Sequence, residues 1–100
     1  MAGFGRVVDR VIKKSDIILE VLDARFIDET RNRGIERRIK SRNKIIIHVI
    51  NKCDFVDKKF LEDAKKRLEN CVFVSSTQHF GISMLKQKIK TLAGRRKIKN

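Results

Sequence analysis

The feature that most constrains the fold is an alternation of short apolar blocks with amphipathic segments. The blocks are Ile17–Leu22, Ile45–Ile50 and Cys71–Val74. Each is short and bounded by polar residues, which favours a strand buried on both faces. Strands that alternate with helices form parallel sheets joined by right-handed crossovers. The sequence therefore predicts an α/β fold with a parallel sheet of about three strands.

The segments around these blocks have the apolar spacing of helices. The predicted helices cover residues 5–14, 31–42, 58–69 and 82–92. The third is the clearest, since Asp57 can act as its N-cap. The second is weaker, because Gly34 costs about 1 kcal/mol relative to Ala in a helix. Residues 23–30 are predicted to form a polar loop, and Glu20 interrupts the first apolar block.

The chain is strongly basic, with a formal net charge of +13 at pH 7. Such a charge favours a polyanionic partner such as nucleic acid. The alternative is a Lys-rich surface that serves only solubility. The basic residues form two clusters, one at Arg31, Arg33, Arg37, Arg38, Lys40, Arg42 and Lys44, and the other at Arg95, Arg96, Lys97 and Lys99.

Length and composition exclude several classes of protein. One small domain fits the length, and we place it at 1–93, with a basic tail or truncated linker at 94–100. The apolar runs are too short to span a membrane, and the start lacks a secretory signal. Cys53 and Cys71 are too few for a structural zinc site. We therefore expect a cytoplasmic chain with reduced thiols and no membrane partner.

Polar motifs follow each of the three apolar blocks directly. They are Asp23-Ala24-Arg25, Asn51-Lys52-Cys53-Asp54 and Ser75-Ser76-Thr77. In an open parallel sheet, ligands bind at the carboxyl ends of the strands. The fold prediction places all three motifs along that edge, where they can contribute to one site.

The second and third motifs have the residue types that a guanine site needs. Guanine presents its N1–H and its N2 amino group side by side, and the two oxygens of the Asp54 carboxylate match this pair of donors. The methylene stem of Lys52 can cover the flat base, and Asn51 can donate and accept hydrogen bonds. Backbone N–H groups at Ser75, Ser76 and Thr77 are candidates to donate to the base O6. The alternative is an ordinary polar turn that leaves a strand.

Together these motifs resemble the amino-terminal part of the circularly permuted GTPases that act in ribosome assembly, the YlqF/YawG-related group. The resemblance covers roughly residues 5–92 and includes S-D-I-I-L-E-V-L-D-A-R, I-I-I-H-V-I-N-K-C-D and F-V-S-S-T-Q-H-F-G-I. The N-K-x-D motif matches completely at Asn51, Lys52 and Asp54. The Ser-Ala-Lys-like motif of the family falls on Ser75, Ser76 and Thr77, where only Ser is kept. Ile27 stands where the family usually has Pro.

The resemblance implies a three-layer, Ras-like part of a P-loop NTPase fold that binds GTP or GDP, with a ribosomal subunit or rRNA as a partner. It also implies that the strand carrying the P-loop would lie beside Ile17–Leu22. Without that strand, we expect an exposed apolar edge that either self-associates or is covered by the first helix.

The phosphate-binding motifs of a GTPase are missing from the sequence. A P-loop reads G-x-x-x-x-G-K-[ST], and neither it nor an Asp-x-x-Gly motif occurs here. We therefore predict no catalytic residue and no metal ligand, weak nucleotide binding and no hydrolysis by this chain alone. Mg²⁺ is expected only together with a P-loop segment, and the chain is expected to be a fragment.

Two alternative functions remain open at this point. The basic clusters fit an RNA-binding α/β module without a nucleotide, although it would lack an aromatic stacking surface. A small structural domain of the receiver type is the other alternative, but paired acidic residues do not follow the first apolar block. Asp23 and Arg25 either mark the nucleotide site, as the resemblance implies, or pair with each other to hold the loop.

Overall fold

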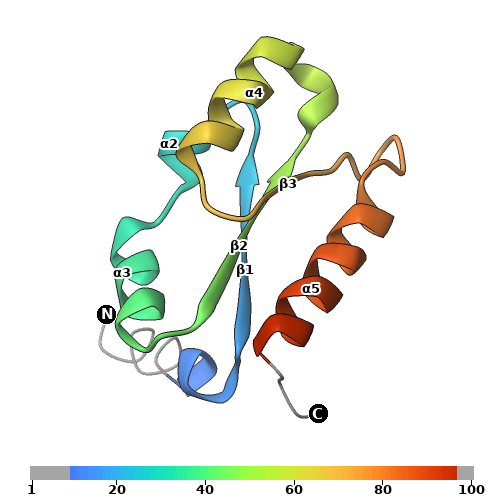
Figure 1. Ribbon diagram of the computed structural model, residues 1–100. Helices are drawn as coiled ribbons and strands as arrows, with labels where there is room; N and C mark the ends of the chain where they lie inside the picture. Colours follow the sequence, from blue (N-terminus) through green and yellow to red (C-terminus); the bar gives the residue numbers. More distant parts are fainter. Residues whose placement is uncertain (1–9, 97–100) are drawn as a thin grey trace.

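The computed structural model describes residues 10–96 and contains a parallel sheet of three strands between helices (Figure 1). The strands are β1 (Ile17–Asp23), β2 (Ile45–Asn51) and β3 (Cys71–Phe73), in the order β1-β2-β3. Both pairings are parallel, and Glu20 of β1 lies beside His48 of β2. The predicted α/β fold is confirmed.

Apart from one short helix, the labelled helices agree with the predicted ones in position but differ at their ends. They are α2 (Ile27–Thr30), α3 (Arg33–Ser41), α4 (Lys58–Arg67) and α5 (Ile82–Arg96). The predicted cap of α4 is present, since the Asp57 side chain accepts a hydrogen bond from the Phe60 amide at 2.9 Å. Helix α2 lies in the predicted polar loop and is held there by Ile27, which is buried in the core.

The described part of the chain begins and ends in helical residues. Residues 10–14 are helical, and the rest of the predicted helix over 5–14 lies outside the described residues. Helix α5 extends past its predicted end at residue 92, so residues 94–96 of the predicted tail are helical. Gly94 alone does not end the helix, because its cost of about 1 kcal/mol is small beside the gain from continued backbone hydrogen bonding.

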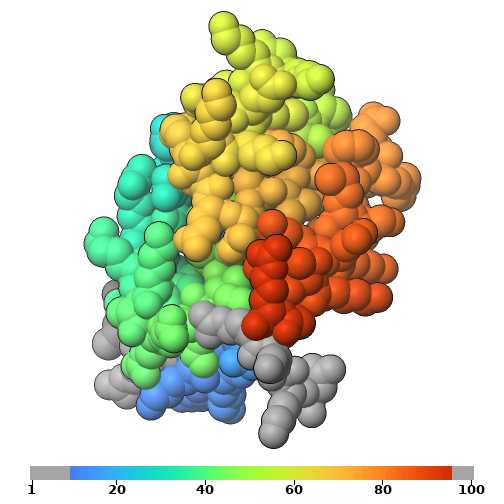
Figure 2. Space-filling view, viewed as in Figure 1, coloured from blue at the N-terminus to red at the C-terminus, as the bar shows by residue number. Residues whose placement is uncertain are grey.

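The core has two layers, one on each face of the sheet, because alternate side chains of a strand point to opposite faces. Helices α2, α3 and α4 pack on one face, where the largest cluster contains Leu22, Ala24, Ile27, Ile50, Ala64 and Leu68. Helix α5 packs on the other face through Leu85, Ile89 and Leu92 against Ile47, Val49, Val72 and Val74. Figure 1 shows α3 and α5 on opposite flanks of the sheet, and in Figure 2 the two helices lie on the left and right sides of the surface.

The first strand is less buried than predicted. Leu19 is 41% exposed and Val21 is 61% exposed, so the prediction of burial on both faces is wrong for β1. The reason is its place at the edge of the sheet, where α5 reaches only its start at Ile17. Within residues 10–14, Ile12 packs with Ile39 and Ile46 on the opposite face, so this segment leaves Leu19 and Val21 open.

None of the helices in the described part of the chain is both long and apolar enough to cross a membrane.

Candidate functional site

The loops that follow β2 and β3 meet at the carboxyl end of the sheet. The Ser75 hydroxyl donates a hydrogen bond to Asp54 Oδ1 at 2.8 Å. Beside it, the Ser76 hydroxyl donates to Asn51 Oδ1 at 3.2 Å. Parallel pairing of β2 and β3 brings the two loops together, because both strands end at the same edge.

Backbone geometry holds the first of these loops in place. Lys52 has a left-handed conformation with φ of 62°, and its amide donates to Asn51 Oδ1 at 2.8 Å. A 3-10 turn follows at Cys53–Phe55. The Cys53 amide donates to the Val74 carbonyl at 3.2 Å, which joins this loop to the one after β3.

The second loop is closed by a backbone bridge between Ser75 and Phe80, whose amides and carbonyls exchange hydrogen bonds at 3.0 Å. Gly81 ends the loop with φ of +86°, and a Cβ at this position would collide with the Phe73 carbonyl oxygen. The sequence Ser75-Ser76-Thr77 is therefore presented by a closed and sterically defined turn.

The predicted site residues differ in their accessibility. Ser75 is buried, Asn51 is half-buried, and Lys52, Asp54, Ser76 and Thr77 are exposed. Within the described part of the chain, Asp54 Oδ2 takes no hydrogen bond, while Ser75 fixes the other oxygen. The Thr77 hydroxyl lies 3.4 Å from the Ser75 hydroxyl. The Asp54 carboxylate is thus oriented by the protein and still free to accept hydrogen bonds from a ligand.

The Asp23-Ala24-Arg25 motif lies at the end of β1, and its Asp23 and Arg25 side chains form an ion pair with each other. The Arg25 guanidinium donates to both Asp23 oxygens at 3.1 and 3.0 Å, and the Arg25 amide donates to Oδ1 at 2.9 Å. These hydrogen bonds hold the pKa of Asp23 well below its usual range. Lys52 Nζ lies 3.3 Å from Asp23 Oδ2, so the motif also contacts the loop after β2.

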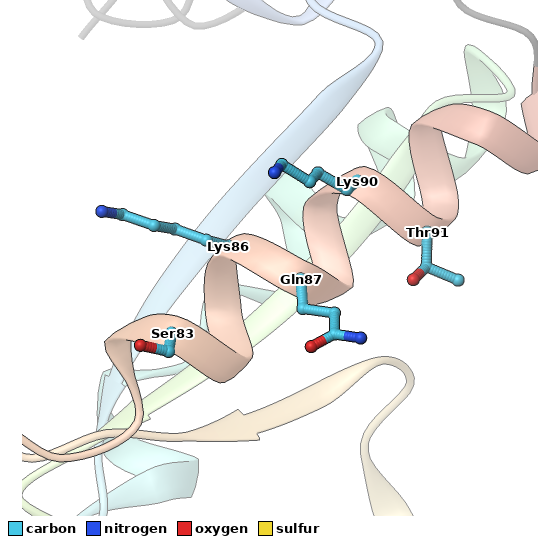
Figure 3. Close-up of a pocket in the computed structure, with 5 residues that line it drawn as sticks. All are labelled: Ser83, Lys86, Gln87, Lys90 and Thr91. Carbon is cyan, nitrogen blue, oxygen red and sulfur yellow. The ribbon is translucent and has the colours of Figure 1, made fainter.

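Two surface hollows are candidate places for a ligand to bind, and they differ in the residues that line them. One of about 230 Å³ lies at the strand ends and is lined by Val21, Leu22, Asp23, Thr30, Asn51 and Lys52. A larger one of about 520 Å³ lies along α5 (Figure 3) and is lined by Ser83, Lys86, Gln87, Lys90 and Thr91. All of the latter side chains come from one helix, so they cannot enclose a ligand.

A buried polar group under α3 was missed by sequence reasoning. His48 Nε2 lies 3.4 Å from Glu20 Oε1 and 3.7 Å from Glu36 Oε2. Burial and the neighbouring Glu36 raise the pKa of Glu20 to about 7. Burial opposes ionisation of Glu36 as well, but hydrogen bonds from Arg31 lower its pKa to about 2. The available signal was a polar residue at the fourth position of both the first and the second apolar block.

The relatives found by comparison with known proteins are named as GTP-binding proteins, guanine nucleotide-binding proteins or GTPases. The chain is 44% identical over 86 residues to an uncharacterized GTP-binding protein of Methanocaldococcus jannaschii, which covers 85% of this chain and 23% of that protein. It is 45% identical over 73 residues to guanine nucleotide-binding protein-like 3 of Mus musculus, covering 68% of this chain and 14% of that protein. A GTPase of Schizosaccharomyces pombe is 39% identical over 71 residues, with 68% and 15% covered.

No protein-family model matches the chain. The chain spans less than a quarter of the length of each of these curated relatives. What is similar is therefore one segment of longer proteins, and the chain is related by sequence to a segment of GTP-binding proteins.

Proposed function

We propose that this chain carries the guanine-recognising part of a GTP-binding domain, of the circularly permuted type found in ribosome-assembly GTPases. The observation that carries the proposal is the contact between Ser75 and Asp54, which orients an exposed carboxylate between two loops at the strand ends. A carboxylate in such a position matches the paired N1–H and N2 donors of guanine.

Each of the other predicted residues has a defined task in this proposal. The methylene stem of Lys52 covers the base, while its Nζ stays within 3.3 Å of Asp23 Oδ2. Asn51 ties the two loops together through Ser76. The backbone N–H of Thr77 is the donor for the base O6, because the Ser75 amide donates to the Phe80 carbonyl and the Ser76 amide donates to Asn51 Oδ1 at 3.4 Å. Adenine lacks the two donors and would leave Asp54 Oδ2 without a partner from the base, which favours guanine.

The proposal includes weak nucleotide affinity and no hydrolysis by these residues alone. Hydrolysis of GTP depends on positioning the phosphates and stabilising their charge, which a P-loop and Mg²⁺ provide. The sequence offers only base contacts, since it contains no P-loop motif. The net charge of +13 supports a ribosomal subunit or rRNA as a further partner.

The open edge of β1 belongs to the same proposal. Leu19 and Val21 are exposed on a strand that pairs along one edge only within residues 10–96, which is the arrangement that accepts a further strand. We propose that β1 pairs either with another segment of the nucleotide-binding domain or with a second copy of this chain. Sedimentation velocity over a range of concentrations measures self-association, and Val21→Lys is expected to reduce it.

The substitution Asp54→Asn tests the proposed guanine site. NMR titration of the wild-type chain with GDP should shift the amide resonances of residues 51–54 and 75–77, with ADP giving smaller shifts. Asp54→Asn should abolish the preference for guanine and favour xanthosine diphosphate, because the xanthine edge presents a carbonyl where guanine has its amino group.

Asp57→Asn is the matched control, because it makes the same chemical change three residues away and Asn also caps helices well. It should leave GDP binding unchanged. Equal GDP binding by the Asp54→Asn variant and the wild-type chain would refute the proposed site. If that variant instead loses RNA binding alone, the RNA-binding alternative replaces the proposal.

A further inference from the structure

Two buried polar atoms between α3 and the sheet lack a partner. Within the described residues, Glu20 Oε1 and His48 Nε2 make no hydrogen bond, although they lie 3.4 Å apart. The His48 side chain is 3% exposed, so water does not replace the missing partner at its surface. Leaving such groups unpaired costs about 1–3 kcal/mol each, which calls for an explanation.

The other ring nitrogen of His48 decides what Nε2 can do. Nδ1 lies 2.6 Å from the Glu69 carbonyl oxygen. A carbonyl oxygen only accepts, so Nδ1 carries the proton, and in the neutral ring Nε2 presents a lone pair. When Glu20 is ionised, this lone pair faces the carboxylate oxygens of Glu20 and Glu36, and acceptors alone cannot satisfy one another.

The charges of Glu20, Glu36 and their partners also favour a cation beside His48. Arg31 Nε donates to both oxygens of Glu36 at 3.0 and 2.8 Å and neutralises that carboxylate. The Asn32 amide occupies Glu20 Oε2 at 3.0 Å but carries no charge. Among the charged groups that residues 10–96 place around His48, the partly buried carboxylate of Glu20 is left without a cationic partner. A cation between the three side chains would satisfy both the charge and the lone pair.

We propose that Glu20, Glu36 and His48 form a binding site for a divalent transition-metal cation such as Zn²⁺. Donor atoms about 2.0–2.2 Å from a tetrahedral zinc ion stand about 3.3–3.6 Å from one another. The two distances from His48 Nε2 are 3.4 and 3.7 Å, and the three donor atoms all lie within 4.8 Å of one another. One imidazole and two carboxylates suit zinc, whereas Mg²⁺ prefers oxygen ligands and retains its waters.

The surroundings hold each ligand in the orientation that metal binding needs. Ligating histidines usually donate their second ring N–H to a carbonyl or carboxylate, as His48 donates to Glu69. The two carboxylates are oriented in the same way, since the Asn32 amide donates to Glu20 and the Arg31 guanidinium donates to Glu36. The site joins β1, β2 and α3, so a bound cation would stabilise the folded chain. It stands independently of the proposed guanine site.

Titration of the metal-free full chain tests the proposal. Calorimetry should show one equivalent of Zn²⁺ bound, and Tm should rise with Zn²⁺ but not with Mg²⁺. Co²⁺ should give visible d–d absorption without sulfur-to-metal charge-transfer bands, because neither cysteine is a ligand. In NMR spectra, Zn²⁺ should shift the ring resonances of His48 more than those of His79.

The variants Glu20→Gln and His48→Gln should each weaken Zn²⁺ binding at least about 10-fold. His79→Gln is the matched control, because it makes the same change at the other histidine, which is exposed, and it should bind Zn²⁺ as the wild-type chain does. The proposal is overturned if the folded wild-type chain binds no Zn²⁺ at millimolar concentration, if the NMR shifts appear at His79 instead, or if both ligand variants bind Zn²⁺ normally.

Discussion

The polar residues at the strand ends and the polar residues beneath α3 form two contrasting regions. At the strand ends, Asp54 is exposed and held by one hydrogen bond from Ser75. Beneath α3, Glu36 is 7% exposed and takes both of its hydrogen bonds from Arg31. The first arrangement leaves capacity for a ligand with hydrogen-bond donors, whereas the second brings three possible metal ligands within 4.8 Å of one another, which is the site we propose for a cation.

The difference teaches that the free-energy cost of a polar residue depends on whether it lies within a strand or just beyond its end. A polar residue just beyond a strand stays near water, so it costs little and can serve binding. A polar residue inside a buried strand must be paired, because an unpaired charge there is expensive. The two regions should therefore respond differently to substitution, because removing the partner of a polar group should cost more stability beneath α3 than at the strand ends.

The largest expected effect is that of Arg31→Ala, which removes the partner of the buried Glu36. Breaking a buried ion pair from one side costs about 3–5 kcal/mol, because the remaining charge is left uncompensated. Urea unfolding in the presence of a chelator measures the free energy of unfolding without a bound metal. A loss below about 1 kcal/mol would remove the energetic contrast between the two regions.

Arg67→Ala provides the matched control for this measurement. Arg67 is also an arginine paired with carboxylates, at 3.1 Å from Asp63 and 3.5 Å from Asp28, but all of these side chains are well exposed. Surface pairs of this kind contribute about 0–1 kcal/mol. Comparing the losses in the free energy of unfolding for Arg31→Ala and Arg67→Ala measures how much the burial of an ion pair adds to the effect of removing it.

The next largest effect is expected for Gly81→Ala, at the loop that presents Ser75. The left-handed φ of +86° and the collision with the Phe73 carbonyl should cost about 1–3 kcal/mol. Because the loop must shift, GDP binding should weaken as well, which links stability to binding at the strand ends. Unfolding and NMR titration measure the two effects on the same variant.

Gly94→Ala is the control for the glycine change. Gly94 lies in α5 with nothing within 4 Å of an added Cβ. Alanine there should stabilise the chain by up to about 1 kcal/mol, since glycine is a poor helix former. A destabilising effect of similar size at both positions would mean that the left-handed turn is not what defines the loop.

The sequence predicts the strand-end region better than the buried one, for a physical reason. Asn51, Asp54 and Ser75 follow apolar blocks directly, and parallel strands bring their ends to one edge whatever the packing details. His48 and Glu20 meet because both occupy the fourth position of adjacent strands, but Glu36 joins them only through the packing of α3. The register of a helix against a sheet depends on side-chain packing that no local pattern specifies.

The exposure of β1 and the presence of α2 could not be predicted from the sequence either, because both depend on how the elements pack together. An apolar block such as Ile17–Leu22 does not reveal whether its strand is central or at an edge, and here the edge position exposes Val21. Residues 27–30 have too short a pattern to indicate a helix. Helix α2 forms because Ile27 gains a buried position beside Leu22 and Ala24.

The smallest expected effect concerns acid stability at the strand ends. Hydrogen bonds from Arg25 lower the pKa of Asp23 in the folded chain, so its contribution to stability is present above about pH 4, the ordinary value in the unfolded chain. The contribution is lost as the pH falls through the lower, native pKa of Asp23. Asp23→Asn removes this contribution at every pH, so the unfolding midpoint of this variant should fall less steeply than that of the wild-type chain between about pH 4 and pH 2.

Asp63→Asn is the control, because Asp63 belongs to an exposed surface pair, and this variant should keep the wild-type slope. Parallel slopes for the Asp23→Asn variant and the wild-type chain would mean that solvent screens the Asp23–Arg25 pair, and that the strand ends contribute to binding without contributing to acid stability.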